Sequence, residues 1–358
     1  MASAAELPLA EAGHLGVRAR SWLWIGAATV FLLAAVLTGM LVGPVDLGVG
    51  TIARAVLSHV PLLGVRSHLS AADSAILWQL RLPRVVLAML VGAMLSAAGA
   101  TYQGTFRNPL ADPYLLGVAA GAGLGATIAI VYGGGSVLGG DLLPLAAFAG
   151  GAAAVTLAYA LGRSAGVSRG PAALVLAGVT VTAFLTAVQT FVQQQHSDTL
   201  QAVYTWILGR LATAGWHDVL LLLPYAGVSG VALLLHRRLL DVLALGDDEA
   251  ASLGVNVGRV RLVLVAAATL GTAGAVAVSG LIGFLGIIVP HAVRLVAGGS
   301  YRVVLPLSIV VGAGFLVFAD VIARTALSPA ELPIGVVTAF FGAPFFAVVL
   351  RTSRMVGP

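Results

Sequence analysis

The sequence has 358 residues, of which 59% are hydrophobic and only 9% are charged, and its mean hydropathy is +1.02. Soluble globular proteins contain about 45–50% apolar and about 25% charged residues, so this composition excludes that class and indicates an integral membrane protein. All 19 basic residues are arginine, and the sequence contains no cysteine. It therefore cannot supply a Walker-A phosphate-binding loop, a Schiff-base lysine, a disulfide or a thiolate site.

Apolar runs long enough to cross a bilayer follow one another along the chain. A hydrocarbon core about 30 Å thick needs about 20 apolar residues per helical crossing. Ten runs fit this length, at residues 21–41, 85–102, 114–132, 142–161, 173–192, 219–236, 262–279, 281–297, 303–323 and 333–350. The two runs between 262 and 297 have almost no polar break, so nine helices are an alternative. We predict an all-α membrane protein with about ten transmembrane helices.

The arginines predict which segments face the cytoplasm. When residues 1–20 are placed inside and the ten runs alternate, 13 of the 19 arginines fall on inner segments. This excess agrees with the positive-inside rule and explains the net charge of +5 without a nucleic-acid partner. No small-residue cleavage site follows the first run, so it is read as a retained helix. We predict one membrane domain at 21–350, with cytoplasmic tails at 1–20 and 351–358.

Two segments between the runs are long enough to form structure of their own. The predicted outer segment at 42–84 could hold a short helix at Thr51–His59. The predicted inner segment at about 239–261 has apolar residues at helical spacing and a break at Gly246. Three acids follow that break, where negative charge favours the first turn of a helix: Asp247, Asp248 and Glu249. We expect two short helices there that form a cytoplasmic docking surface.

Ionisable side chains are nearly absent from the predicted spans. Asp320 is the clearest, and Arg324 follows it by one helical turn, so a local i, i+4 ion pair is the preferred explanation. The histidines are scattered singly, without the spacing of a zinc site. A carrier driven by protons or sodium usually needs membrane carboxylates or broken helices. The sequence therefore favours a separate motor, and a carrier or channel that uses Asp320 is the alternative.

Five motifs resemble a known transporter family. In chain order they are Leu80-Arg-Leu-Pro-Arg84, Gly104-Thr-Phe-Arg-Asn-Pro-Leu-Ala-Asp-Pro113, Gly246-Asp-Asp-Glu-Ala-Ala-Ser-Leu-Gly254, Gly283-Phe-Leu-Gly-Ile-Ile-Val-Pro-His-Ala-Val-Arg294, and Pro329-Ala-Glu-Leu-Pro-Ile-Gly335 with Gly342-Ala-Pro344. Their order and spacing resemble those in the permease subunits of ABC importers for iron chelates, haem and cobalamin. These permeases form the FecCD-like family, of the vitamin B12 importer type. The resemblance extends from about residue 80 to the C-terminus.

The resemblance implies a type II ABC importer permease fold and a set of partners. Two permease copies would pair around a central pathway in the inner membrane, as a homodimer in membrane lipid. Two ATPase subunits would lie beneath them, and an extracytoplasmic binding protein would deliver the substrate above. ATP would be used by the ATPase subunits, so the permease itself would be no enzyme and would have no covalently bound cofactor.

The resemblance also implies three sites on this chain. Outer-face arginines that receive acidic residues of the binding protein are Arg81, Arg84 and Arg324. All three fall outside in the topology above, and ordinary interfacial arginines are the alternative. Pathway-narrowing residues between the second and third helices are Asn108, Pro109 and Leu110, with the segment from Gly162 to Pro171 as their partner. A proline-stiffened connector explains that loop equally well.

The third implied site couples the permease to its motor. The residues that would sit in a cleft of the ATPase are Asp247, Asp248, Glu249, Leu253 and Gly254. A solvated charge run is the alternative, although apolar residues alternate with the acids. We therefore predict the permease subunit of an ATP-driven importer for a large metal chelate, such as haem, cobalamin or a ferric siderophore. A stand-alone secondary transporter or channel coupled to an ion gradient is the alternative function.

Overall fold

The computed structural model describes residues 7–43, 45, 47–58, 69–133, 142–164, 171–209 and 211–353, and these residues are helical apart from their connections. The helices are α1 (Leu7–Leu41), α2 (Val49–Leu57), α3 (Ala71–Ala75), η1 (Ile76–Arg81), α4 (Leu82–Phe106), α5 (Val118–Tyr132), α6 (Leu142–Ser164), α7 (Pro171–Gln195), η2 (Ser197–Thr199), α8 (Leu200–Ile207), α9 (Trp216–Leu245), α10 (Asp247–Ser252), α11 (Val257–Ser279), α12 (Leu285–Ala297), α13 (Tyr301–Thr325) and α14 (Ile334–Ser353). Within the described part, the only strand-like pairing is a bridge between Leu327 and Ala330.

Each of the ten predicted crossings corresponds to a helix. Among the described residues, seven helices are long and apolar enough to span a membrane, and three shorter apolar helices supply the rest: Val118–Tyr132, Leu285–Ala297 and Ile334–Val349. The two apolar runs between 262 and 297 form separate helices, α11 and α12, as the prediction of ten helices requires. Gly280 ends α11 with a φ of 70°, and Phe284 precedes α12 with a φ of 67°, so a left-handed turn divides the apolar run.

Two features of the predicted connections differ from the structure. Helix α1 begins at Leu7, within the stretch predicted as an N-terminal tail. The expectation of two short helices around Gly246 is half wrong, because the first of them is the end of α9, which continues to Leu245. Only α10 is a separate short helix, and Gly246 separates it from α9 with a φ of 138°. The short helix expected near Thr51 is α2.

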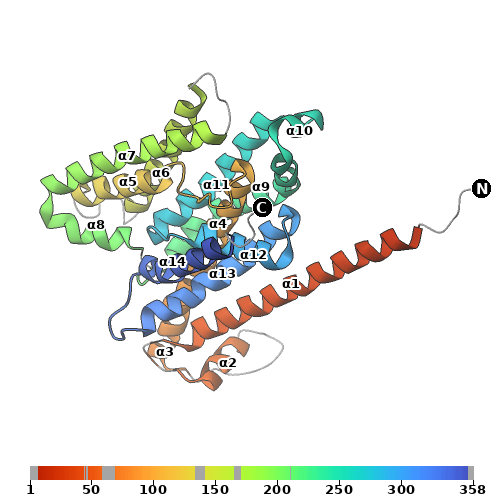
Figure 1. Ribbon diagram of the computed structural model, residues 1–358. Helices are drawn as coiled ribbons and strands as arrows, with labels where there is room; N and C mark the ends of the chain where they lie inside the picture. The colour runs from red at the N-terminus through yellow and green to blue at the C-terminus, as the bar shows by residue number, and fades with distance from the viewer. Residues whose placement is uncertain are drawn as a thin grey trace, which may run out of the picture.

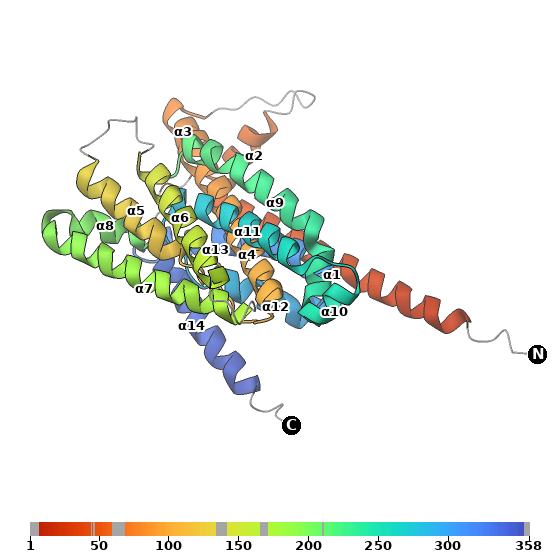
Figure 2. The same ribbon diagram turned by 90° about the horizontal axis from the view of Figure 1, so that it is seen from above.

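Helix α4 forms the centre of the molecule, where it packs against α9, α11, α12 and α13 (Figure 2). The six-residue π-helix η1 leads into it without interruption, and Pro83, in the first turn of α4, has no N–H to continue the ladder. The Trp78 carbonyl accepts from Nε1 of Trp216 instead, at 2.8 Å. Nearly every residue from Val91 to Phe106 is buried. In lipid, helices approach closely where small residues meet. A Cβ at Gly99 would overlap the Gly286 carbonyl of α12, so this crossing requires glycine.

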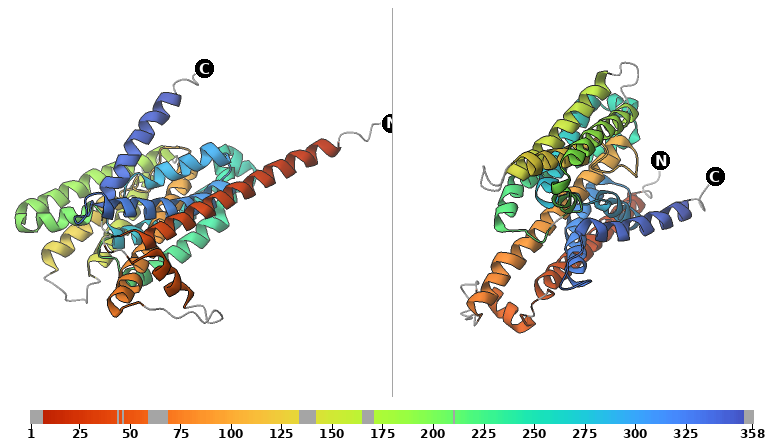
Figure 3. Two further views of the ribbon diagram at one scale, coloured as in Figure 1. Left: turned by 90° about the horizontal axis from the view of Figure 1, so that it is seen from below. Right: turned by 90° about the vertical axis from the view of Figure 1, so that its left-hand side faces the viewer.

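The bundle has two ends that matter for function. Helix α8 lies at one end of the molecule and α10 at the other (Figures 1 and 2). The C-terminal part of α14 projects away from the bundle (Figure 3). We call the two ends the α8 end and the α10 end. The predicted docking arginines belong to the first and the predicted coupling residues to the second.

Candidate functional site

The α8 end contains a cluster of five charged side chains, here called the arginine cluster: Arg81, Arg84, Asp320, Arg324 and Glu331. Arg81 ends η1, and Arg84 lies in the first turn of α4. Arg324 lies in the last turn of α13, and Glu331 follows in the loop before α14. The three predicted docking arginines and Glu331 line one cavity of about 250 Å³, so the structure brings these distant residues together.

Arg84 is held between two carboxylates. Its Nη2 lies 2.8 Å from Oδ1 of Asp320 and 2.9 Å from Oε2 of Glu331. Asp320 also lies 3.7 Å from Nε of Arg324, which confirms the predicted i, i+4 pair. Asp320 is only 1% exposed, whereas Glu331 is 30% exposed. Glu331 is therefore the partner of Arg84 that another carboxylate can most readily replace.

The other two arginines are buried and hold the end of α1. Arg81 donates from Nη1 to the carbonyls of Met40, at 3.0 Å, and Leu41, at 3.3 Å, and it also contacts the Val45 carbonyl. Arg324 donates from Nη2 to the Gly39 carbonyl at 2.6 Å. Their exposed fractions are 5% and 3%. These carbonyls at the end of α1 lack helical partners, and buried guanidinium groups supply the missing donors.

The α10 end contains the predicted coupling residues. Asp248, Glu249, Leu253 and Gly254 are exposed, whereas Asp247 is half-buried. Leu253, which follows the last residue of α10, is 63% exposed. Gly254 has a φ of 81° and ends α10, where the Val255 N–H donates to the Ala250 carbonyl at 3.1 Å. The segment therefore presents two acids and a leucine outward on a short, well-capped helix.

Asp247 points inward and joins three elements. Its Oδ1 lies 2.9 Å from Nη2 of Arg261 on α11 and 3.4 Å from Nη2 of Arg107 at the end of α4. The Arg261 side chain is 7% exposed, so its ion pair with Asp247 is the more strongly buried of the two. This carboxylate connects α10 to α11 and to the predicted gate loop. The resemblance implied coupling for all five residues of the segment, and the structure separates Asp247 from the four exposed residues.

The predicted gate residues lie in the α4–α5 loop, directly after Arg107. Arg107 has a φ of 52°, which ends α4. Asn108 then accepts from the Leu110 N–H through Oδ1 at 2.9 Å, an Asx turn that fixes Pro109 between them. Asn108, Pro109 and Leu110 are all exposed. Of their predicted partner segment, residues 165–170 lie outside the described residues.

Asp112 in the same loop has an unusual environment. It is partly buried, and burial raises its pKa to about 6, although the Tyr114 N–H donates to it at 2.7 Å. The folded protein therefore holds a proton on Asp112 at a pH where the unfolded chain has lost it. Stability from this group falls as the pH rises from about 4 through 6, because the native state then binds more protons than the unfolded state.

Replacing Asp112 with asparagine is expected to raise stability by about 2–3 kcal/mol at pH 7.5 and by only about 1 kcal/mol at pH 4.5, where the native carboxyl is already neutral and only the unfolded chain is ionised. Asparagine keeps an oxygen acceptor for the Tyr114 N–H. Thermal unfolding of the purified protein at the two pH values measures the difference. A stabilisation of the same size at both pH values would contradict the account.

The described residues contain no cluster of side chains that could bind a metal ion. In the part of the chain that the structure describes, no three His, Asp or Glu side chains come close enough to bind a metal ion. The polar contacts at the α10 end instead join helices, as where Arg294 of α12 donates to Gln103 of α4. The two charged sites therefore consist of ion pairs between helices and of exposed charged side chains.

Comparison with known proteins agrees with this arrangement. The model of the FecCD transport family matches residues 8–352. The chain belongs to this family. The ABC transporter permease protein YvrB of Bacillus subtilis is 40% identical over 321 residues, covering 89% of this chain and 91% of YvrB. The cobalamin import system permease protein BtuC of Halobacterium salinarum is 39% identical over 363 residues, covering 93% of this chain and 97% of BtuC.

A solved structure extends the comparison to the fold. A metal-chelate type ABC transporter in an inward-facing conformation has a TM-score of 0.79 and 29% identity, and the match covers 92% of this chain and 99% of that one. The FecCD chain is therefore an ABC transporter permease with the type II importer fold, as its motifs predicted. It is a multi-pass membrane protein.

The sequence motifs did not identify Glu331 or the carbonyls at the end of α1 as parts of the arginine cluster's surroundings. Glu331 lies in the Pro329–Gly335 motif, in a loop predicted to face the outer side, and three arginines were predicted on the same side. An acid on the same side as three arginines was a usable signal. No signal in the sequence pointed to the backbone of α1, because hydrogen bonds to carbonyls depend only on the three-dimensional arrangement.

Proposed function

We propose that this FecCD permease is the membrane-spanning subunit of an ATP-driven importer, which takes up a large metal chelate from an extracytoplasmic binding protein. Haem, cobalamin and ferric siderophores are the substrate class, in keeping with the cobalamin import named for the Halobacterium relative. One observation carries the proposal: Asp247 ties the helix that faces outward at the α10 end to the loop predicted as the gate.

The α10 end is the proposed site of the motor. Asp248, Glu249 and Leu253 would contact a separate ATPase subunit, which binds and hydrolyses the ATP. A shift of α10 would then pass through Asp247 to Arg107 and the gate loop, and through Arg261 to α11. ATP binding and hydrolysis would thus favour different permease conformations through contacts that differ between them. No covalently bound cofactor is part of this proposal.

The α8 end is the proposed docking site, and Arg84 is its centre. Arg84 is partly accessible, and Glu331 pairs with it from an exposed loop. An acidic residue of the binding protein would displace Glu331 and take its place on the guanidinium, a bidentate geometry that fixes orientation. Arg81 and Arg324 would contribute positive potential from beneath, while they hold α1 in position.

Replacing Glu331 with glutamine is expected to tighten binding-protein docking by about two- to fivefold, because a competing surface carboxylate is removed. Surface plasmon resonance at low and high salt measures the affinity and its salt dependence. Asp198→Asn is the matched control, since it removes an exposed acid on η2, away from the cluster. Equal affinities of both variants and the parent protein would reject docking at Arg84.

Assembly with a second copy is proposed on the exposed apolar faces of α7 and α14. Phe184 is 63% exposed on α7, and Phe340 is 73% exposed on α14. We propose a homodimer in the inner membrane with both termini cytoplasmic, which puts the α10 end inside. The sequence has no cysteine, so cross-linking of Phe340→Cys tests this contact without background. Absence of any cross-linked dimer would contradict it.

Co-purification tests the proposed function as a whole. The permease should retain an ATPase subunit, and addition of chelate-loaded binding protein should stimulate ATP hydrolysis in the complex. Asp248→Ala with Glu249→Ala should weaken retention of the ATPase, because both acids lie on the exposed face of α10. Full retention by this double variant would contradict the coupling assignment.

A further inference from the structure

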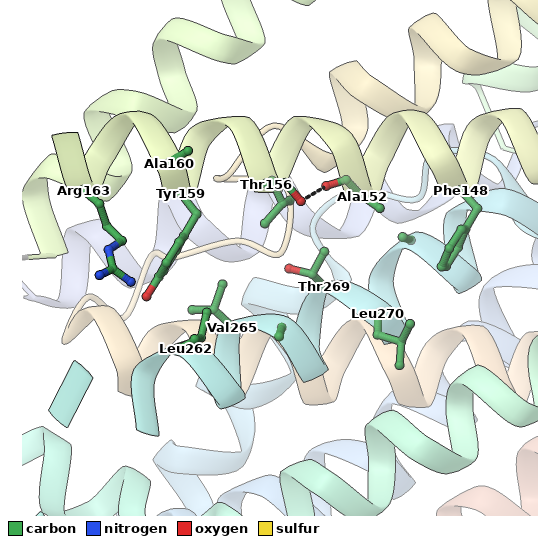
Figure 4. A pocket seen from close by; sticks show the side chains of 13 residues that line it. Phe148, Ala152, Thr156, Tyr159, Ala160, Arg163, Leu262, Val265, Thr269 and Leu270 are labelled. Atoms are coloured by element: carbon green, nitrogen blue, oxygen red, sulfur yellow. Dashed lines mark hydrogen bonds between the residues drawn. The ribbon is translucent and has the colours of Figure 1, made fainter. Parts of the chain in front are cut away.

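A groove on the side of the bundle runs between α6 and α11 (Figure 4). It encloses a cavity of about 630 Å³, and most of its lining is apolar. Leu262 and Ala266 of α11 lie exposed along it, opposite Ala160 of α6. Phe148, which lines the groove far from the α10 end, contacts Tyr225 of α9 with ring centroids 4.9 Å apart.

The groove continues into a basic pocket towards the α10 end. A second cavity of about 640 Å³ shares Tyr159, Arg163 and Leu262 with the first, so the two form one continuous depression. Three guanidinium groups line this second cavity: Arg163, Arg259 and Arg261. No carboxylate lines it among the residues that the structure describes. An apolar channel that ends in a basic pocket matches a molecule with an apolar tail and an anionic head.

The arginines of the pocket have unused capacity for an anion. Arg163 lies over the ring of Tyr159 at 5.9 Å, and within the described ranges neither Arg163 nor Arg259 forms an ion pair. Arg261 bonds Asp247 through Nη2, but its Nε is buried without a hydrogen-bond partner in the described part of the chain. The first turn of α11 begins at Val257 beside them and adds positive potential.

The length of the groove fits one leaflet of a bilayer. From Leu262 to Ala273, α11 rises by about 16 Å at about 1.5 Å per residue. Half of a hydrocarbon core about 30 Å thick is about 15 Å. Arg259 lies one helical turn before Leu262, so a groove that spans one leaflet would put Arg259 at the level of the phosphate groups. Basic pockets between helices at such a boundary are suited to anionic lipid head groups.

We propose that this groove binds an anionic diacyl phospholipid. One acyl chain lies between α6 and α11, and the phosphate contacts Arg163 and Arg259, with the buried charge of Arg261 behind them. Arg261 also pairs with Asp247, so the lipid sits beside the coupling contact and stabilises α11 in the position that the contact requires. This binding needs neither ATP nor a chelate, and its test is therefore independent of the proposed function.

To test the proposal, the intact protein is exchanged into dioleoyl phosphatidylglycerol or dioleoyl phosphatidylcholine, and native mass spectrometry then measures how much of each lipid it retains. The parent protein is expected to retain phosphatidylglycerol about tenfold better, because each basic residue at the surface favours an anionic lipid. Arg163→Gln with Arg259→Gln is expected to remove this preference. Arg302→Gln is the matched control, since Arg302 is 62% exposed on α13 and does not line the groove.

Two further variants separate the acyl chain from the head group and from a protein partner. Ala266→Phe fills the groove and should lower phosphatidylglycerol retention while the arginines are intact. Ala266→Cys should give no cross-link between copies. The proposal would be overturned if the parent protein retained the two lipids equally, or if retention were unchanged in the double arginine variant or in Ala266→Phe. A cross-link through Ala266→Cys would also overturn it. The last result would assign the groove to a second copy of the chain.

Discussion

Replacing Asp320 with asparagine is expected to destabilise the permease by about 3–5 kcal/mol, since breaking a buried ion pair leaves uncompensated charge. Asp320 is 1% exposed and contacts both Arg84 and Arg324. After the substitution, Glu331 would be the one carboxylate of the cluster, and it reaches Arg84 from an exposed loop. Thermal unfolding of the purified protein in detergent or nanodiscs measures the loss.

Two controls define what the Asp320 result means. Asp248→Asn removes the same charge from an exposed position and should change stability little. Glu331→Gln removes the exposed partner of Arg84 and should cost about 1 kcal/mol or less. Equal losses for Asp320→Asn and Asp248→Asn would contradict the buried-pair interpretation. A carboxylate fixed between two arginines is also poorly placed to bind and release a coupling ion, which disfavours the ion-driven carrier.

Replacing Asp247 with alanine is expected to uncouple the permease from its motor. The change removes the carboxylate that joins α10 to Arg261 and Arg107, yet leaves the exposed acids of α10 in place. The ATPase should still co-purify, while uptake per ATP hydrolysed falls by about tenfold, since network contacts typically carry about 0.5–2 kcal/mol of coupling. Paired measurements of uptake and phosphate release in vesicles give this ratio.

The neighbouring residue provides the comparison for Asp247. Asp248→Ala should instead lower the amount of ATPase retained, with little change in uptake per ATP for the complexes that form. Asp247→Glu keeps the charge and should restore part of the coupling. If Asp247→Ala and Asp248→Ala gave the same pattern of loss, the distinction between an inward link and an outward contact would be wrong.

The membrane spans could be predicted from the sequence because lipid imposes a local rule. Backbone groups in the hydrocarbon core must be satisfied within each helix, so every crossing leaves a continuous apolar run. All ten runs correspond to helices for this reason. The end of α9 was harder to predict, because Arg237 and Arg238 ended the apolar run while the helix itself continued to Leu245.

The pairings within the sites could not be predicted in the same way. Arg84 and Glu331 are 247 residues apart in the chain, and nothing local relates them. The orientation of Asp247 did have a local signal. Ala250 is fully buried and lies three residues after Asp247, on the same face of α10, so helical periodicity separates both from the exposed Asp248. The groove between α6 and α11, with its apolar and basic halves, could be recognised only in the packed structure.

Uptake into vesicles tests most directly whether the power for transport comes from outside this polypeptide. Vesicles containing the permease alone, or the permease with its ATPase, are loaded with ATP or given a proton or sodium gradient, and entry of labelled chelate from its binding protein is measured. The account predicts uptake only with the ATPase and ATP together, unaffected by collapse of the ion gradients. Gradient-driven uptake by the permease alone would contradict it.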